Sequence, residues 1–265
     1  MILKVLFFGD IVGKIGRQAV KKILPKLKKE YKPDLILANA ENLAHGIGMT
    51  EKTIDEMQEA GVDFFTSGNH FLKKEEIRDR LSSPETNILR PANYPPGVPG
   101  RGEKLLEIGL KRVVVVNLVG RVFMGEDFDC PFRKFDEIFE KYKNDKVPII
   151  VDFHAEATSE KVALGYYLDG RAAAIVGTHT HVATADQRVL PGGSAFVSDI
   201  GMVATLDSVI GVEKKEVIKM FLTQLPLRHE LPEEGEVLVN AVYFEIDLEK
   251  NKAKSIERVD RVIKI

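Results

Sequence analysis

Ala172-Ala-Ala-Ile-Val-Gly-Thr-His-Thr-His181 carries the clearest sign of how this chain folds. It begins with a short apolar run, which is typical of a buried strand. The run ends at Gly177, and two histidines follow, separated by one threonine. In extended backbone, residues i and i+2 share a face, so the imidazoles of His179 and His181 can reach one metal cluster. The stretch therefore predicts a buried strand with a metal-binding end.

Four other segments repeat this pattern of an apolar run followed by residues that bind metals. Leu3–Phe8 precedes Gly9-Asp10, Leu35–Leu37 precedes Asn39-Ala-Glu41-Asn42, Phe64–Ser67 precedes Gly68-Asn69-His70, and Val147–Phe153 precedes His154. In layered α/β proteins, ligands gather beyond the carboxyl ends of such strands. We therefore expect two carboxylates, two asparagines and four histidines to converge at one sheet edge.

The rest of the chain alternates strands with helices and then changes to hairpins. Helices are expected at about 15–29, with Pro25 kinking or splitting the helix, at 50–60 with Thr50 as N-cap and Gly61 as stop, and at 73–81, 131–142 and 159–168. Residues 87–102 predict an irregular surface connection, 105–108 and 112–118 a hairpin, and 237–246 and 253–265 two long strands joined by 249–252. This order indicates two sheets packed together with helices outside.

Composition narrows the class of protein. The chain is 44% hydrophobic and 29% charged, as in soluble globular proteins, and its formal net charge of −2 argues against a broad nucleic-acid binder. Cys130 is the single cysteine, so an intramolecular disulfide and a cysteine-based zinc site are excluded. The apolar N-terminus reads as a first strand rather than a signal peptide, and no run approaches the about 18 apolar residues of a membrane span. We expect a soluble, cytoplasmic protein.

Each metal-site candidate also has an ordinary interpretation. Asp10, with Gly13 and Lys14 after it, does not match the spacing of a phosphate-binding loop, and taken alone it would be a solvated turn residue. Glu41-Asn42 could cap a helix, and His154 could be a hydrogen-bonded core residue. Their joint position at strand ends favours a metal centre, and the mixture of carboxylate and imidazole suits iron, manganese or zinc.

Three further residues receive less weight. His45 could line the pocket or simply face solvent in its loop, and His229 lies in a polar stretch that indicates a surface position. Ser194 follows Gly192-Gly193 but lacks the nucleophile-elbow pattern, so serine catalysis is not expected.

With these segments assembled, the chain resembles the calcineurin-like metallophosphoesterases, and within them the YmdB-type family. The matching segments are Gly9-Asp10-Ile-Val-Gly13, Ala40-Glu41-Asn42, Gly68-Asn69-His70, Arg90-Pro-Ala-Asn93, Asp152–Glu160 and Gly177–His181. The resemblance covers essentially the whole chain and implies a single domain, residues 1–265, with a four-layer αββα sandwich. It also implies two transition-metal ions, with iron first and manganese or zinc as alternatives. One ion would be held by Asp10, Glu41, Asn42 and His181, and the other by Glu41, Asn69, His154 and His179.

Two stretches depart from the wider superfamily or from the family. The superfamily usually opens with Asp-x-His, whereas Asp10 is followed by Ile11-Val12, and Glu41 takes the place of a bridging Asp. This departure marks the YmdB-type branch. Gly201–Leu206 replaces a Gly-Pro-Tyr-like segment common in relatives, so the substrate preference is in doubt if this loop touches substrate.

The expected activity is hydrolysis of a small phosphodiester, such as a 2′,3′-cyclic nucleotide. A metal-bound hydroxide would attack, and His70 would protonate the departing alkoxide rather than bind metal. A phosphomonoesterase with the same centre and a non-catalytic protein that binds metal or nucleotide are the alternatives. The expected partner is a small phosphodiester or nucleotide, with no membrane and no extended nucleic-acid surface, and a homo-oligomer is left open.

Overall fold

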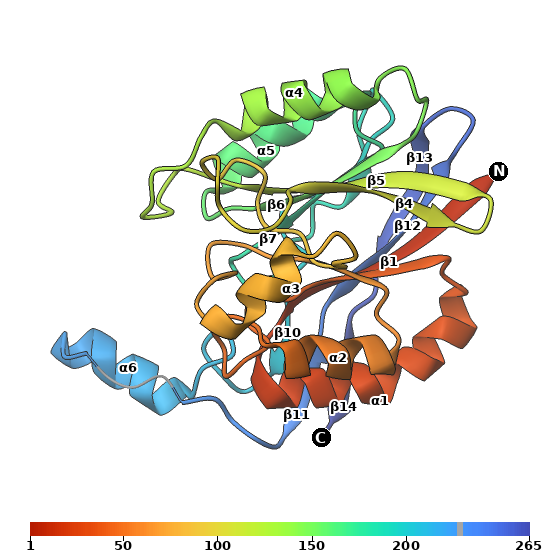
Figure 1. Cartoon of the computed structure of the whole chain (residues 1–265). Coiled ribbons are helices and arrows are strands. Elements are labelled where there is room, and N and C mark those ends of the chain that lie inside the picture. Colours follow the sequence, from red (N-terminus) through yellow and green to blue (C-terminus); the bar gives the residue numbers. More distant parts are fainter. Residues whose placement is uncertain (227–229) are drawn as a thin grey trace.

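Two β-sheets lie face to face at the centre of the structure, a computed structural model that describes residues 1–226 and 230–265 (Figure 1). The strands are β1 (Ile2–Ile11), β2 (Leu35–Asn39), β3 (Phe64–Thr66), β4 (Glu103–Ile108), β5 (Lys111–Val119), β6 (Ile149–His154), β7 (Ala174–Thr178), β8 (Arg188–Val189), β9 (Ala195–Val197), β10 (Met202–Thr205), β11 (Glu236–Val239), β12 (Ala241–Asp247), β13 (Lys252–Arg258) and β14 (Arg261–Lys264). The helices are α1 (Gly13–Tyr31), α2 (Glu51–Ala60), the 3₁₀ helix η1 (Glu75–Ile77), α3 (Arg78–Ser82), α4 (Pro131–Tyr142), α5 (Thr158–Leu168) and α6 (Lys214–Thr223).

The strand order brings the ends of five strands to one edge. In the first sheet the order is β13-β12-β1-β10-β11-β14, with β2 on the other side of β1 and β3 beside β2. In the second sheet it is β4-β5-β6-β7-β9-β8. β1, β2 and β3 are parallel to one another, as are β6 and β7, so within each sheet their carboxyl ends share an edge.

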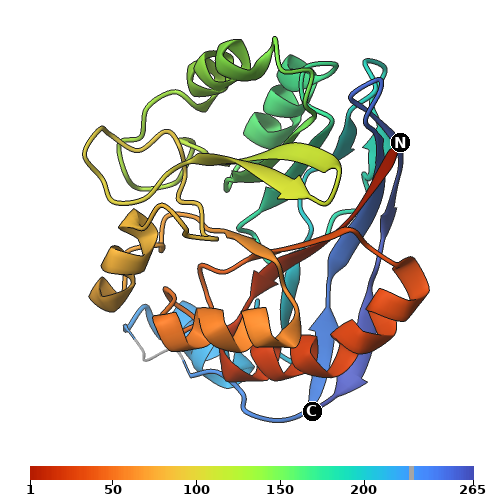
Figure 2. The ribbon, with the colours of Figure 1, turned by 45° about the vertical axis from the view of Figure 1, so that its right-hand side comes forward.

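Alternating side chains of β1 show why the sheets stack. Leu6 and Phe8 face a core that α1 and α2 cover, whereas Val5 and Phe7 face a core between the two sheets. Successive strand residues point to opposite faces, so both faces of β1 are buried. A third core lies between the second sheet and helices α4 and α5. This arrangement confirms the predicted four layers, helix–sheet–sheet–helix (Figure 2).

Two predicted helix features have clear outcomes. Thr50 caps α2 by accepting a hydrogen bond from the Thr53 backbone N–H, and Gly61 ends the helix with a φ of 105°, as predicted. Of the two outcomes expected at Pro25, a kink or a split, the helix does not split, because it continues to Tyr31. Its C-terminal part turns away from its first turns (Figure 2), which is the kink that a proline causes.

Two other expectations need correction. The helix predicted over 73–81 is a 3₁₀ turn from Glu75 followed by a short α-helix to Ser82. The connection at 87–102 is irregular as predicted, but its first half does not lie on the surface. Ile88 and Leu89 are buried. Ile88 forms a β-bridge with Phe65 and packs in the core beneath α1 and α2, whereas Leu89 packs in the core between the two sheets.

The C-terminal region differs more. Each of the two predicted long strands is divided in two. The first is interrupted at Asn240, between β11 and β12, and the second at residues 259–260, between β13 and β14. The two interruptions are joined by a hydrogen bond that the Asn240 side chain donates to Asp260. The hairpin between β12 and β13 is confirmed. The segment at 201–206, considered as a substrate loop, is largely strand β10, and its residues Met202–Thr205 are buried beside the end of β1.

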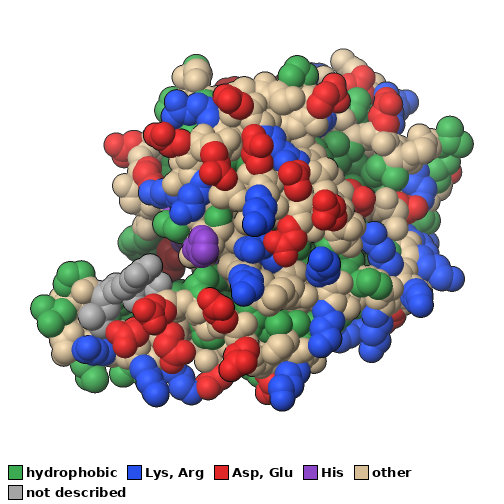
Figure 3. All heavy atoms as spheres, turned by 60° about the horizontal axis from the view of Figure 1, so that its bottom comes forward, with side chains coloured by type: hydrophobic (Ala, Val, Ile, Leu, Met, Phe, Trp, Pro, Cys, Tyr) green, Lys and Arg blue, Asp and Glu red, His purple; other side chains and the backbone are tan. Residues whose placement is uncertain are grey.

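Helix α6 was not predicted and projects from the body (Figure 1). Figure 3 shows hydrophobic side chains on this projection, while acidic and basic side chains are interspersed over the rest of that face. The interspersed charges agree with the small net charge. Among the described residues, no helix combines the length and the apolar character that crossing a bilayer requires.

Candidate metal centre

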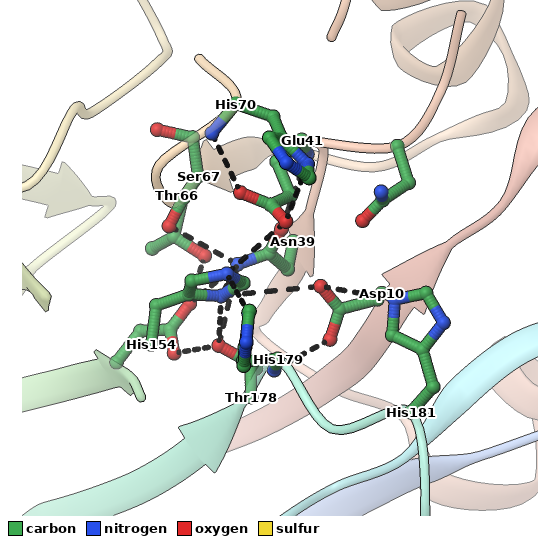
Figure 4. A network of polar contacts seen from close by, with 12 residues as sticks. Asp10, Asn39, Glu41, Thr66, Ser67, His70, His154, Thr178, His179 and His181 are labelled. Carbon is green, nitrogen blue, oxygen red and sulfur yellow. Dashed lines mark hydrogen bonds and ion pairs between the residues drawn. The ribbon is translucent and has the colours of Figure 1, made fainter. Parts of the chain in front are cut away.

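The predicted site residues lie at the edge where the carboxyl ends of parallel strands from the two sheets come together (Figure 4). Asp10 lies in β1, Glu41 follows β2, His70 follows β3, His154 ends β6 and His179 follows β7. The pairing of β1 with β2 shifts register between Phe8 and Asp10, and such a bulge re-aims the following side chain. Residues far apart in sequence are thus brought to one place by both sheets.

Glu41, His154 and His179 form the centre of the cluster. His154 Nε2 lies 3.1 Å from Glu41 Oε1 and 3.0 Å from His179 Nδ1. One ligand atom from each of the three residues lies within 4.8 Å of the others, which is the geometry of a potential metal site. His154 is fully buried and the Glu41 side chain is 2% exposed, so this group of atoms lies in a low-dielectric environment.

Asp10 and His181 form the adjoining part of the site. Asp10 is fully buried, and its Oδ1 lies 3.9 Å from His154 Nδ1 and 4.0 Å from His181 Nε2. The other oxygen accepts a hydrogen bond of 3.1 Å from the His179 backbone N–H. His181 Nδ1 lies 2.9 Å from the Ile210 carbonyl oxygen and donates to it, which leaves Nε2 free on the Asp10 side.

Three buried oxygens at this site lack any hydrogen-bond partner within residues 1–226 and 230–265. They are Oδ1 of Asp10, Oδ1 of Asn42 and Oδ1 of Asn69. Leaving a buried acceptor unsatisfied costs about 1–3 kcal/mol, so such atoms are rare unless they serve a ligand. All three belong to the predicted ligand set, and oxygen together with imidazole suits a transition metal. The residues present therefore fit metal ions.

Gly68 shows how closely the segments approach. A Cβ added at this position would collide with the side chains of Glu41 and His154. Only glycine lets the end of β3 pass close enough for Asn69 and His70 to face the cluster.

The structure adds a buried hydrogen-bond network that the sequence analysis did not assign. Thr178 Oγ1 donates to Asp152 Oδ1 at 2.8 Å and accepts from His154 Nδ1 at 2.9 Å. Asp152 also accepts from the Thr66 hydroxyl and, at 3.1 Å, from Asn39 Nδ2. The Thr178 hydroxyl keeps a proton on His154 Nδ1, so Nε2, which faces Glu41, is the nitrogen that can give up its proton to bind a metal.

Burial and charge shift the pKa values of these groups in the absence of metal. Burial raises the pKa of Asp10, and it raises that of Asp152 to about 6. Burial opposes the charge of His154, but Glu41 outweighs it and raises the His154 pKa to about 9. Burial and then the positive charge of His154 lower the pKa of His179 to about 3. Neighbouring ionisable groups with such divergent pKa values are typical of functional sites.

His70 lies at the edge of the cluster. Its Nδ1 is 3.3 Å from Glu41 Oε1, and its side chain is 26% exposed, more than those of the other three histidines of the site. Its backbone N–H donates to Glu41 Oε2 at 3.1 Å. The contact with Glu41 places His70 at the site, and its exposure leaves it open to a substrate.

The remaining candidates lie elsewhere. His45 is exposed in its loop with a φ of 55°, and within the described part of the chain no hydrogen bond or ion pair joins it to the cluster. Ser194 is buried, donates to the Ala172 carbonyl and accepts from the Gly170 N–H, which is a structural role. His229 lies outside the described residues. Glu156, within the matching segment Asp152–Glu160, was not predicted as a site residue, yet its Oε2 lies 3.1 Å from His179 Nε2.

Comparison with known proteins places this geometry in a family. A protein of Bacillus subtilis (strain 168) named 2′,3′-cyclic-nucleotide 2′-phosphodiesterase is 46% identical over 257 residues, covering 97% of this chain and 96% of that protein. The crystal structure of a novel phosphatase from Mycoplasma pneumoniae superposes with a TM-score of 0.92 at 34% identity, covering 99% of this chain and 94% of the other.

A more distant structure supports the fold alone. NAD nucleotidase (NadN) of Haemophilus influenzae gives a TM-score of 0.60 at 16% identity, covering 100% of this chain and 56% of that protein. The four layers are those of the calcineurin-like metallophosphoesterases, as the sequence predicted. The family model described as YmdB-like protein matches residues 6–259. On these matches, this chain belongs to the YmdB-like protein family.

Proposed function

We propose that this protein is a metal-dependent phosphodiesterase that hydrolyses small phosphodiesters such as 2′,3′-cyclic nucleotides. The names of its relatives support the coarser assignment, a hydrolytic phosphoesterase. The observation that supports the metal assignment is the cluster of Glu41, His154 and His179, together with buried oxygens of Asp10, Asn42 and Asn69 that have no hydrogen-bond partner among the described residues. Both sheets contribute to the site, which supports our proposal that residues 1–265 form one catalytic domain.

In this proposal the site would hold two transition-metal ions, iron first and manganese or zinc as alternatives, and Glu41 would be a ligand of both. Asp10, Asn42 and His181 would complete the ligands of one ion, and Asn69, His154 and His179 would complete those of the other. When bound, two such ions supply Lewis acidity that polarises a phosphoryl oxygen and acidifies water. The proximity of Glu41 to both His154 and His70 supports its central place.

His70 is the proposed proton donor. Its partial exposure and its contact with Glu41 support this role, because a proton donor must lie near the proposed centre and be accessible to a leaving group. A positioned imidazole can give its proton to the departing alkoxide of a diester, which is a poor leaving group. His154, in contrast, is buried and held by Thr178, so it is suited to binding and not to proton transfer with substrate.

The charges favour a diester over a monoester. Asp10 and Glu41 supply two negative charges, so two divalent ions would leave a positive excess that attracts a phosphate anion. A diester carries one negative charge and a monoester dianion carries two, so the diester requires less positive charge from the site. Arg90 donates to the Pro91 carbonyl and Arg171 pairs with Asp136, and among the described residues neither forms a hydrogen bond or ion pair with the cluster.

Paired kinetics on adenosine 2′,3′-cyclic phosphate and 3′-AMP test this assignment, at one pH and one metal loading. We expect a higher kcat/KM for the cyclic diester. A tenfold or greater preference for the monoester would contradict the diesterase proposal and favour a phosphomonoesterase with the same centre. No turnover of either ester by metal-loaded protein would favour a non-catalytic binding protein.

A further inference from the structure

The segment that carries two proposed ligands has an unusual backbone. His179 has a φ of 102° and His181 has a φ of 64°, although neither residue is glycine. Side-chain-bearing residues rarely adopt positive φ, and such strain persists only where the surroundings hold it. Something in the fold must therefore fix the His179-Thr180-His181 segment.

Asp199 contacts this segment at its middle residue. The Thr180 backbone N–H and its hydroxyl both donate to Asp199 Oδ2, at 3.1 and 2.7 Å. The other carboxylate oxygen accepts from the Gly201 N–H at 2.8 Å, beside the start of β10. The Asp199 carboxylate thus connects Thr180, which lies between the two histidines, to the start of β10, the strand that pairs with β1 at Asp10.

Lys161 of α5 completes the anchor. Its Nζ donates to Asp199 Oδ2 at 2.6 Å, and the side chains of both residues are only 2% exposed. Its stem passes under the end of β7, where a Cβ added at Gly177 would lie 3.2 Å from Lys161 Cδ. An apolar pair often replaces a buried ion pair without loss of stability, so stability alone does not account for one here.

We propose that Lys161 is a positioning residue that acts through Asp199 and Thr180 to hold the His179 and His181 imidazoles toward the metal centre. The inference rests on the proposed function, because the two histidines are ligands only under that proposal. Among the described residues, Lys161 forms no hydrogen bond with either histidine, so its effect would pass through the Asp199 carboxylate and the backbone of Thr180.

Glu160, the neighbouring residue, provides a matched control. It is also buried in the first turns of α5, but its carboxylate accepts from the backbone N–H groups of Arg121 and Val122. It therefore anchors the loop after β5, which carries none of the proposed ligands. Loss of Glu160 removes a buried charge from the same helix turn without releasing Thr180.

The test is calorimetric titration of the full-length, chelator-treated protein with Mn²⁺. Loss of a group that orients metal ligands weakens metal binding by about 10–100-fold, so we expect Lys161→Met to do so. Glu160→Gln should bind Mn²⁺ as the unaltered protein does, and Lys161→Arg, which keeps the charge, should recover part of the affinity. Unchanged affinity in Lys161→Met, or an equal loss in Glu160→Gln, would overturn the proposal.

Two further measurements keep the result clear. If Lys161→Met does not fold, Thr180→Val removes the hydroxyl contact with Asp199 from the other end and should also weaken Mn²⁺ binding; unchanged affinity there would overturn the proposal. If the unaltered protein binds no Mn²⁺, Zn²⁺ or Fe²⁺, the proposed function fails instead. Faster amide exchange at Thr180 in Lys161→Met than in Glu160→Gln would then still support the positioning role, and equal exchange would refute it.

Discussion

Replacing Thr178 with valine should weaken metal binding while leaving the fold intact. Thr178 is fully buried at the end of β7, and valine has nearly the same shape and the same preference for strands. The substitution removes only the hydroxyl that joins His154 to Asp152. Without that hydroxyl, the proton is no longer held on His154 Nδ1, and Nε2 is not kept free for a metal.

The magnitude follows from the two hydrogen bonds that are lost. His154 Nδ1 and Asp152 Oδ1 are both buried, and each unsatisfied group costs about 1–3 kcal/mol of the free energy of unfolding. Metal affinity should fall by about 10–100-fold, the usual effect of removing a group that orients a ligand. This loss corresponds to about 1.4–2.8 kcal/mol of binding free energy.

Thr66→Val is the matched control. Thr66 is also buried at a strand end and its hydroxyl also donates to Asp152, but it forms no hydrogen bond with His154. Urea unfolding should show a loss of stability in both variants, whereas calorimetric titration with Mn²⁺ should show weaker binding only in Thr178→Val. Equal Mn²⁺ affinity in the two variants would refute the reasoning about the His154 proton.

Three further predictions concern the metal centre. Glu41→Ala should remove more metal than Asn42→Ala, because it takes away a shared, charged ligand and not one neutral oxygen; equal metal content by elemental analysis would show that Glu41 does not bridge. His70→Ala should retain metal but lose about 10²–10⁴-fold in kcat, less for a nitrophenyl diester, because an acidic leaving group needs no proton; loss of metal would make His70 a ligand. The raised pKa of His154, about 9, means that metal must displace a proton there. Mn²⁺ affinity should therefore rise with pH toward 9, and calorimetry in buffers of different ionisation enthalpy should detect the released proton.

The layers and the site edge could be predicted because their signals are local. Each apolar run ends beside a residue such as Asp10 or His154, and strands with this pattern pack as predicted. Confirmed helix limits at Thr50 and Gly61 likewise depend on neighbouring residues only. The metal and catalytic roles of the site residues stay predictions, although the structure brings Asp10, Glu41 and the four histidines together.

The support around the site could not be predicted, because it depends on contacts between distant strands. Thr178, Asp152 and Asn39 are ordinary residues within their strands, and only the packing of the two sheets makes them a network. The same holds for Lys161 and Asp199, which look like surface charges in the sequence but are buried. Helix α6 was not predicted, and its apolar residues Phe221 and Leu222 are exposed instead of packing on a core.

The number of metal ions that active protein carries tests the central claim most directly. Protein purified without chelator should contain close to two transition-metal ions per chain by elemental analysis. Chelation should abolish phosphodiester hydrolysis, and added Fe²⁺, Mn²⁺ or Zn²⁺ should restore it, because the ions are needed to polarise the phosphoryl group of the substrate. Full activity in protein with no bound metal, or with only one ion per chain, would contradict the dinuclear centre.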